Sequence, residues 1–463
     1  MTLDKTDPEI IAAFALLDAQ LEAERKNKMI PGLSVAVVYD QEIIWAKGFG
    51  YSNLEKKISA DQKTIYRIGS ITKLFTSTML MQLRDAEKLH LDEPIEKYLS
   101  TFKIKSSFSN SRSPTFLQVV SHTAGLPREA PLDYWQTLKF PSINVVLKSL
   151  KNAEIIFPTM TEIKYSNLGI AILGHALERI ANKPYKQYVK EHILQPLGMN
   201  NSGFDLSDEM KTHMAIGYFA TKDNESHEIA PHPDIGAFAP AGQLYSSVED
   251  ISHFISLQFR DNPIGGKQIL GGSTLREMHS PVFMAPNWKG GIAIGWALRQ
   301  KSGHTCIGHG GGIYGFTADI TLVIDMKLGI AVFVNTGMDL NNIVSSAIDL
   351  LIPVFSRVLS RKQADPIRVA PHDLQKYTGH YSMLRPDKME MEIRIAVGKL
   401  VAIFNEEPPG TEITFIPESK HNFRMEGGFV NGELATFELS EGGNITQVKL
   451  GNFTFERVPP RFL

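Results

Sequence analysis

Apolar residues follow helical spacing at the start of the chain. Ile10, Phe14 and Leu17 recur at intervals of three or four residues, directly after Asp7-Pro8. An aspartate followed by proline is typical of a capped helix start. The pattern therefore predicts an amphipathic first helix.

Strand patterns come next, and they predict the start of a sheet. Residues 32–39 and 42–49 are β-rich runs on either side of Asp40-Gln41, which indicates a hairpin. Strand patterns return at residues 292–299, 318–324 and 329–335, and we expect these to complete the same sheet.

Helical spacing dominates the long interval between these two groups of strands. From residue 70 to about residue 285 apolar positions recur as on one face of a helix, with Pro- and Gly-rich loops between them. The clearest segments are residues 70–87, 167–180 and 186–194. This interval reads as a helical insertion into the sheet.

A change of pattern near residue 366 predicts a domain boundary. A last helix over residues 341–359 is followed by the polar stretch 360–366, which we interpret as a linker. Short alternating strands separated by Gly, Pro and Asn turns then indicate a small all-β domain. They are residues 389–395, 399–404, 435–439, 445–450 and 453–457. We expect an α+β domain over residues 1–365 and an all-β domain over residues 366–463.

Composition narrows the classes of partner. The 463 residues are 43% hydrophobic and 21% charged, with a net charge of −2. Acids and bases are interspersed, so nothing predicts binding to nucleic acid or to an anionic membrane surface. One cysteine, Cys306, excludes an intramolecular disulfide and a thiol cluster for zinc. We expect no metal and no cofactor.

The sequence leaves the cellular compartment open. No apolar run approaches the roughly 18–20 residues of a membrane helix, and no basic-then-apolar secretion signal begins the chain. We expect either a cytoplasmic protein or a processed exported form.

Ser70-Ile71-Thr72-Lys73 is the first candidate for chemistry, at the point where strands give way to a helix. Residues at i and i+3 share a helix face, so the Lys73 amine can reach the Ser70 hydroxyl. A buried lysine has a lowered pKa and can take the serine's proton. The motif alone is weak, because such a pair arises by chance about once or twice in a chain of this length. Ser100-Thr101-Phe102-Lys103 matches too, and its surroundings predict a solvated loop.

Tyr165-Ser166-Asn167, just before a predicted helix, is the second candidate. A tyrosine near a lysine can act as a general acid or base, and an asparagine amide can bind a substrate carbonyl. The same letters occur at Tyr51-Ser52-Asn53, where a turn or cap role is the better interpretation.

His309-Gly310-Gly311-Gly312 is the third candidate. Glycines let a substrate approach main-chain N–H groups closely, as an oxyanion site requires. Taken alone, the segment fits a flexible turn better than a functional site. Trp135 and Tyr134 are further open cases, because they suit either the wall of a cleft or the core.

The order of these motifs resembles the serine β-lactamase and penicillin-binding protein superfamily, whose pattern is serine-x-x-lysine, then a second polar motif, then a glycine-containing triplet. Tyr165-Ser166-Asn167 and His309-Gly310-Gly311 resemble the class C β-lactamase, esterase and D-aminopeptidase branch. Flanking segments also resemble it: residues 66–69, 121–126, 240–242 and 244–247. The resemblance spans about residues 8–360 and implies a β-lactamase/transpeptidase-like fold.

The resemblance implies a role for each matching residue. Ser70 would be the acylated nucleophile, and Lys73 and Tyr165 would transfer protons. Asn167 would bind the substrate amide, and the backbone N–H groups of Ser70 and Gly312 would form the oxyanion hole.

His309 departs from the family pattern, since it stands where a lysine is usual. A histidine, with an ordinary pKa of about 6.5, is a weaker clamp for the carboxylate of a β-lactam than a lysine. In the family, a His-led triplet is typical of esterases and D-amino-acid peptidases. Tyr377-Thr378-Gly379-His380-Tyr381, at the start of the all-β domain, resembles the lipocalin-like extension of some such peptidases.

The sequence therefore predicts a serine hydrolase that acts through an acyl-enzyme on small esters or peptide amides, including D-amino-acid ones. One alternative is a β-lactamase or DD-carboxypeptidase. A second, from another class, is a non-catalytic structural, filament-forming or binding protein on the same fold. Self-association into a homo-oligomer is left open.

Overall fold

A computed structural model describes residues 3–108, 113–221, 226–260, 268–362, 370–383, 389–404 and 412–459. The chain divides into two compact units, Met1–Val358 and Leu359–Leu463. Each unit is described by itself below.

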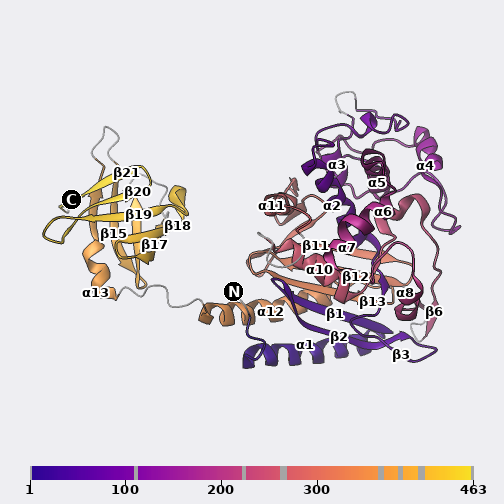
Figure 1. The fold of residues 1–463 in the computed structure, drawn as a ribbon, viewed down its shortest axis with the longest axis horizontal. Helices are drawn as coiled ribbons and strands as arrows, with labels where there is room; N and C mark the ends of the chain where they lie inside the picture. Colours follow the sequence, from indigo (N-terminus) through magenta and orange to yellow (C-terminus); the bar gives the residue numbers. More distant parts are fainter. Residues whose placement is uncertain are drawn as a thin grey trace. The chain divides into compact units, whose positions relative to one another are not determined.

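A nine-stranded antiparallel sheet forms the centre of the first unit (Figure 1). β1 (Gly32–Tyr39) pairs on one side with β2 (Glu42–Asn53), as the predicted hairpin requires, and on the other with β13 (Leu328–Val334). All eight residues of β1 are buried, because helices cover both faces of the sheet at this position. The prediction that early and late strands share one sheet is confirmed.

The sheet order is β3-β2-β1-β13-β12-β11-β10-β9-β8. The remaining strands are β3 (Ile58–Ser59), β8 (Phe283–Met284), β9 (Gly290–Ile292), β10 (Ala297–Lys301), β11 (His304–Ile313) and β12 (Phe316–Val323). Two small sheets lie outside it, β4 (Tyr66–Arg67) with β7 (Tyr245–Ser246), and β5 (Tyr218–Ala220) with β6 (His227–Ile229).

One predicted strand is wrong. Residues 292–299 form the end of β9, a turn and the start of β10, and Ile292 pairs with Ala297 across that turn. Gly295 makes the turn with a φ of +83°, a backbone conformation that residues other than glycine rarely adopt. The apolar run continues across the turn because Ala293, Ile294 and Trp296 are buried there.

Helices cover both faces of the sheet (Figure 1). α1 (Pro8–Asn27) begins as predicted, with the Asp7 carboxylate accepting a hydrogen bond from the Glu9 N–H at 2.8 Å. Its Phe14 ring stacks on Trp45 of β2 at 5.8 Å. α10 (Val248–Gln258) packs against β1 and β13.

α12 (Asn341–Lys362) lies on the same side of the sheet as α1, and Arg357 forms an ion pair with Glu9 at 2.9 Å. By length and composition alone, residues Asn341–Arg361 are apolar enough to cross a membrane, with a mean hydropathy of 1.6. A single helix of this kind is weak evidence for a membrane span, so the expectation that no membrane helix is present is not overturned. Half of the segment is buried inside the structure, as in an ordinary core helix.

Most helices of the first unit lie in the segment between β2 and β8. Its longest helices are α2 (Thr72–Asp85) and α5 (Asn167–Ala181), which pack against each other. The others are α10, described above, and α3 (Phe116–Val120), α4 (Ile143–Ser149), α6 (Tyr185–Val189), α7 (Gln195–Leu197), α8 (Asp208–His213), α9 (Ala239–Gly242) and α11 (Gly272–His279). Residues 186–194, predicted as one helix, comprise most of α6 and a π-helical turn, Lys190–Leu194.

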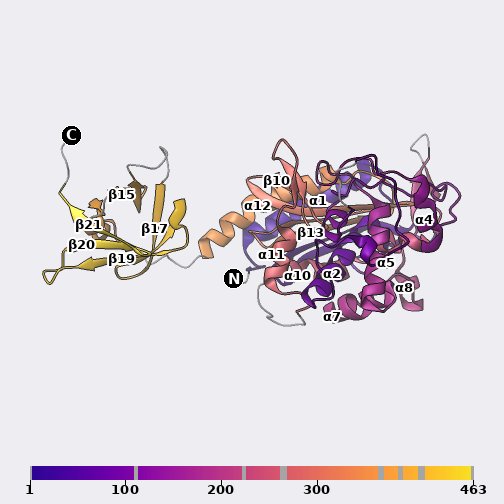
Figure 2. The same ribbon diagram turned by 90° about the horizontal axis from the view of Figure 1, so that it is seen from above.

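The second unit contains a closed eight-stranded barrel, seen from above in Figure 2. It follows the short helix α13 (Pro371–Leu374). Its strands are β14 (Gly379–Ser382), β15 (Glu390–Ala396), β16 (Lys399–Phe404), β17 (Glu412–Ser419), β18 (Asn422–Glu426), β19 (Leu434–Leu439), β20 (Ile445–Leu450) and β21 (Phe453–Val458). The predicted α+β fold followed by an all-β domain is confirmed.

Buried aromatic side chains fill the barrel. Tyr377 and Phe437 have ring centroids 4.8 Å apart, and Phe423 and Phe415 pack beside them. Of the predicted linker, residues 360–362 belong to α12, and residues 363–366 lie outside the described residues.

Candidate active site

A sharp turn presents Ser70 at the start of α2. The preceding strand β4 is held against β7 by pairing of Tyr66 with Ser246. Gly69, with a φ of +50°, then opens a short 3-10 turn, η1 (Gly69–Ile71), that contains Ser70. The chain passes directly from this turn into α2, so Ser70 is fixed by a strand on one side and a long helix on the other.

The Lys73 amine contacts the Ser70 hydroxyl from the next turn of the helix. Lys73 Nζ lies 2.9 Å from Ser70 Oγ and donates a second hydrogen bond to the Ala241 carbonyl oxygen at 2.7 Å. The side chain is buried, and burial holds the pKa of the Lys73 amine well below its ordinary value of 10.5. A neutral amine can accept a proton, which an ammonium group cannot.

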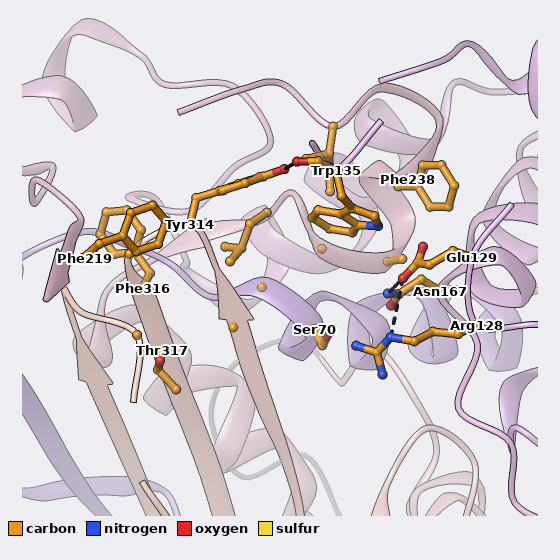
Figure 3. A pocket seen from close by; sticks show the side chains of 18 residues that line it. Ser70, Arg128, Glu129, Trp135, Asn167, Phe219, Phe238, Tyr314, Phe316 and Thr317 are labelled. Atoms are coloured by element: carbon orange, nitrogen blue, oxygen red, sulfur yellow. Dashed lines mark hydrogen bonds and ion pairs between the residues drawn. The ribbon is translucent and has the colours of Figure 1, made fainter. Parts of the chain in front are cut away.

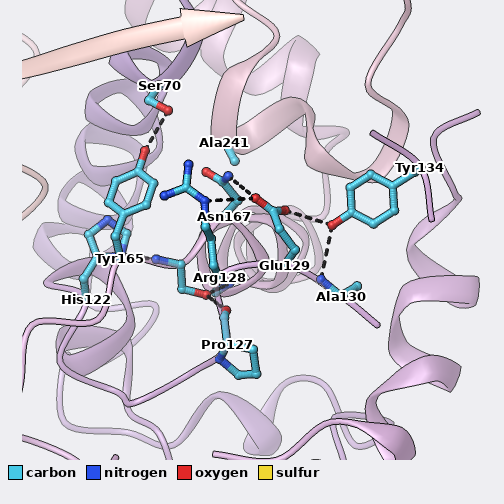
Figure 4. Close-up of polar contacts among 12 residues, drawn as sticks. Ser70, His122, Pro127, Arg128, Glu129, Ala130, Tyr134, Tyr165, Asn167 and Ala241 are labelled. Atoms are coloured by element: carbon cyan, nitrogen blue, oxygen red, sulfur yellow. Dashed lines mark hydrogen bonds and ion pairs between the residues drawn. The ribbon is translucent and has the colours of Figure 1, made fainter. Parts of the chain in front are cut away.

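Tyr165 reaches Ser70 from the segment before α5 (Figure 4). Its hydroxyl donates a hydrogen bond to Ser70 Oγ at 2.7 Å, and Lys73 Nζ lies 4.8 Å from the ring centroid. Burial raises the pKa of the Tyr165 hydroxyl to about 12. Near neutral pH this group therefore carries its proton and acts as a donor.

Two histidines lie beside Tyr165, and both are neutral near pH 7. The buried His122 ring packs 4.6 Å from the Tyr165 ring, and its Nδ1 accepts a hydrogen bond from the Ser166 N–H. Burial lowers the pKa of His122 well below 6.5 and that of the half-buried His309 to about 4. His309 therefore supplies no positive charge to the site at neutral pH.

The glycine triplet is part of strand β11, not of a flexible turn. Because these glycines have no side chains, the backbone of this strand packs closely against the Ser70 turn. A β-carbon on Gly69 would lie 2.7 Å from the Gly312 nitrogen. A β-carbon on Gly311 would lie 3.0 Å from the Ser70 nitrogen. Gly310 differs, since it is exposed and its β-carbon would meet nothing closer than 3.7 Å.

Asn167, the first residue of α5, is tied to a carboxylate. Its Nδ2 donates to Glu129 Oε1 at 2.6 Å, while Glu129 Oε2 accepts from the Tyr134 hydroxyl at 2.8 Å (Figure 4). The Ser166 hydroxyl caps α5 by accepting from the Gly169 N–H. Glu129 therefore holds the side-chain amide of Asn167, while the Ser166 cap fixes the start of its helix.

These groups border a cavity of about 570 Å³ (Figure 3). Ser70, Asn167 and Gly312 line it, so three of the predicted site residues face the same cavity. Its aromatic lining is Trp135, Phe219, Phe238, Tyr314 and Phe316. Of the two open cases, Tyr134 is buried in the core, whereas Trp135 lines the cavity.

The two decoy motifs have other surroundings. Ser100 and Lys103 are exposed in a loop, as predicted. In the second decoy, Asn53 ends β2 and its side-chain oxygen accepts from the Lys56 N–H at 2.8 Å, which is a turn-capping role.

Three contributors were not among the predicted site residues. Arg128 and Glu129 line the cavity, and the Ala241 carbonyl accepts from Lys73. Arg128 and Glu129 stand in a loop with no periodicity and no motif of their own. The only signal in the sequence was their position just after the segment 121–126, which resembles a segment of the family.

The sequence profile of the family described as Beta-lactamase matches residues 17–341. "Beta-lactamase-like protein 2" of Dictyostelium discoideum is 31% identical over 79% of this chain and 67% of that protein. Two solved structures share the fold. The octameric penicillin-binding protein homologue from Pyrococcus abyssi has a TM-score of 0.65 at 23% identity, covering 96% of this chain and 99% of that one. The class C beta lactamase from Rhodobacter sphaeroides has a TM-score of 0.62 at 19% identity, covering 74% and 99%.

Proposed function

The chain belongs to the beta-lactamase family, and we propose that within it the protein is a serine hydrolase that acts through an acyl-enzyme on small esters or peptide amides. One observation carries the proposal: Ser70 Oγ stands between Lys73 Nζ at 2.9 Å and the Tyr165 hydroxyl at 2.7 Å. A serine with a neutral amine and a proton donor at hydrogen-bond distance has the parts needed for nucleophilic attack.

In the proposed acylation, neutral Lys73 takes the Ser70 proton as Oγ bonds to the substrate carbonyl carbon. The backbone N–H groups of Ser70 and Gly312 stabilise the resulting oxyanion. As the bond to the leaving group breaks, Tyr165 gives its proton to the departing oxygen or nitrogen, and Lys73 returns a proton to Tyr165. In deacylation water attacks the ester, with the same groups moving the proton.

The neutral state of His309 bears on the substrate. A pKa of about 4 leaves no charge at this position to pair with the carboxylate of a β-lactam or of a D-Ala-D-Ala terminus. This supports esters and peptide amides, including those with a D-residue, over the β-lactamase or DD-carboxypeptidase alternative. Efficient turnover of nitrocefin would favour that alternative.

The two domains have separate proposed roles. We assign the chemistry to residues 1–365 and regard residues 366–463 as an accessory domain. The barrel's packed aromatic interior supports an accessory role in assembly over one in carrying a ligand. Gel filtration of the full chain tests this, and large assemblies without probe labelling would support a structural protein.

Labelling by a fluorophosphonate probe tests the hydrolase proposal. We expect labelling of the wild type and hydrolysis of p-nitrophenyl esters, and loss of both in Ser70→Ala. Ser100→Ala is the matched control, because it removes the serine of the exposed decoy motif and should leave both unchanged. Labelling of Ser70→Ala equal to that of the wild type would refute the proposal.

A further inference from the structure

His122 contacts the chain on both sides of Tyr165 and packs on its ring. The His122 carbonyl oxygen accepts a hydrogen bond from the Lys164 N–H at 2.8 Å, and its Nδ1 accepts one from the Ser166 N–H at 3.2 Å. The centroids of the His122 and Tyr165 rings lie 4.6 Å apart, and the rings are inclined by 43° (Figure 4). One residue therefore holds the backbone just before Tyr165, the backbone just after it, and the side chain itself.

The backbone of His122 adopts an uncommon conformation. Its φ is +56°, in the left-handed region that residues other than glycine, asparagine and aspartate rarely enter. Further backbone bonds join the same loop to the segment before Tyr165. The Thr123 carbonyl accepts from the Met160 N–H, and the Gly125 carbonyl accepts from the Ile156 N–H, each at 2.8 Å. Residues held in such conformations are concentrated at functional sites.

Proton transfer depends on where the Tyr165 hydroxyl stands. It donates to Ser70 Oγ at 2.7 Å, and a displacement of about 1 Å can cost about 10²-fold in rate. The Arg128 guanidinium also lies over the Tyr165 ring, at 5.3 Å, but the Arg128 side chain is 63% exposed. His122 is 4% exposed, so it is the firmer of these two contacts.

A neutral imidazole suits this position. Because Nδ1 of His122 accepts the Ser166 N–H, the proton of the neutral ring is on Nε2. Burial holds the pKa of His122 well below 6.5, so the ring is neutral near pH 7. An imidazolium would instead place an N–H of its own against the Ser166 N–H.

We propose that His122 is a positioning residue that directs the Tyr165 hydroxyl toward Ser70 Oγ. His122 does not line the cavity, so it acts on the substrate only through Tyr165. The inference rests on the proposed hydrolase function, in which Tyr165 protonates the leaving group.

Two substitutions that tolerate a positive φ test the side chain without disturbing the turn. His122→Asn keeps an acceptor near the place of Nδ1, whereas His122→Gly removes both acceptor and ring. The substrates are the phenyl and p-nitrophenyl esters of one acid, which give the same acyl-enzyme. Phenoxide is the poorer leaving group and depends more on a proton from Tyr165.

We expect His122→Gly to lower the phenyl-to-p-nitrophenyl ratio of kcat/KM by about tenfold or more, and His122→Asn to restore most of it. Thermal unfolding shows whether each variant is folded. If His122→Gly does not fold, His122→Phe takes its place, because it keeps a ring and loses the acceptor. Equal losses for the two esters would overturn the inference and leave His122 a packing residue.

A double-mutant cycle with Tyr165→Phe tests whether His122 acts through Tyr165. With the hydroxyl already absent, His122→Gly should change kcat/KM by about twofold or less, and full additivity would overturn the inference. His279→Asn is the control: burial lowers the pKa of His279 to about 4 as well, but this ring packs edge-on against Trp296. It should keep the wild-type ester ratio. Failure of Ser70 to react with the fluorophosphonate probe would instead refute the hydrolase proposal itself.

Discussion

Gly311 and Ile68 lie so close together that a β-carbon on Gly311 would stand 2.0 Å from the Ile68 carbonyl oxygen. Real β-carbons do not approach an atom at this distance, so only glycine lets β11 rest on the backbone that leads into Ser70. The contact fixes the distance between two backbone N–H groups from segments far apart in the sequence, those of Ser70 and Gly312.

Gly311→Ala should therefore impair catalysis. The added methyl must push β11 away from the Ser70 turn, and loss of one oxyanion donor costs about 10²–10³-fold in kcat. Ester hydrolysis and thermal unfolding measured together separate this from misfolding. Gly310→Ala is the comparison variant, since the same methyl meets nothing closer than 3.7 Å there, and we expect a much smaller loss. Equal losses would argue against a role for the close approach.

Lys73→Arg should lose activity although it keeps a long basic side chain at this position. An arginine stays protonated and cannot act as a base, and loss of a general base costs about 10²–10⁴-fold. In the wild type, kcat/KM should fall as pH decreases through the lowered pKa of Lys73, so the acid limb of the profile should lie well below pH 10.5. An acid limb near pH 10 would contradict a buried, neutral Lys73.

Tyr165→Phe should keep the fold and slow the reaction. The ring remains to pack against His122, while the hydrogen bond to Ser70 is lost. Because the pKa of Tyr165 is raised to about 12, we expect it to serve as a proton donor, so the loss should be larger for poor leaving groups that need protonation. The measurement is the ratio of anilide to p-nitrophenyl ester turnover in the variant and the wild type.

His309→Lys should shift selectivity toward anionic substrates. The wild-type imidazole is neutral at pH 7 because its pKa is lowered to about 4, whereas a lysine would bring a positive charge to β11. We expect nitrocefin turnover to rise relative to neutral ester turnover. An unchanged ratio would show that this position does not contact the substrate's anionic group.

Acid should destabilise the protein between pH 6.5 and pH 4. Burial lowers the pKa values of His122, His232, His279 and His309, so over this range the unfolded chain binds protons that the folded protein does not. The free energy of unfolding then decreases as pH falls. Urea unfolding at several pH values measures it. His279→Gln, distant in sequence from the site motifs, should flatten the pH dependence without changing the pH 7 activity.

The sequence predicted the elements whose periodicity was regular and the residues whose chemistry formed a motif. The hairpin at Asp40-Gln41, helix α5 and the approach of Lys73 to Ser70 followed from local pattern alone. Glu129 did not, because its importance comes from contacts with Asn167 and Tyr134 that only the folded chain creates.

Tertiary contacts also explain why the predicted strand over residues 292–299 was wrong and why the glycine triplet could not be assigned from the sequence. The turn at Gly295 sits inside an apolar run because the turn itself is buried, so hydrophobicity could not reveal it. Glycine triplets favour turns in general, and here the triplet is a strand because β12 pairs with it along its length.

The register that joins Leu33 of β1 to Val334 of β13 has a consequence for the order of events during synthesis. The hairpin of β1 and β2 is synthesised early, but β13, the other partner of β1, is synthesised only near the end of the first unit. Sheets built from such distant partners fold slowly and expose unpaired strand edges meanwhile. We therefore expect reactivity at Ser70 to emerge late, only once β11 has docked, so a nascent chain ending before β11 would be inert.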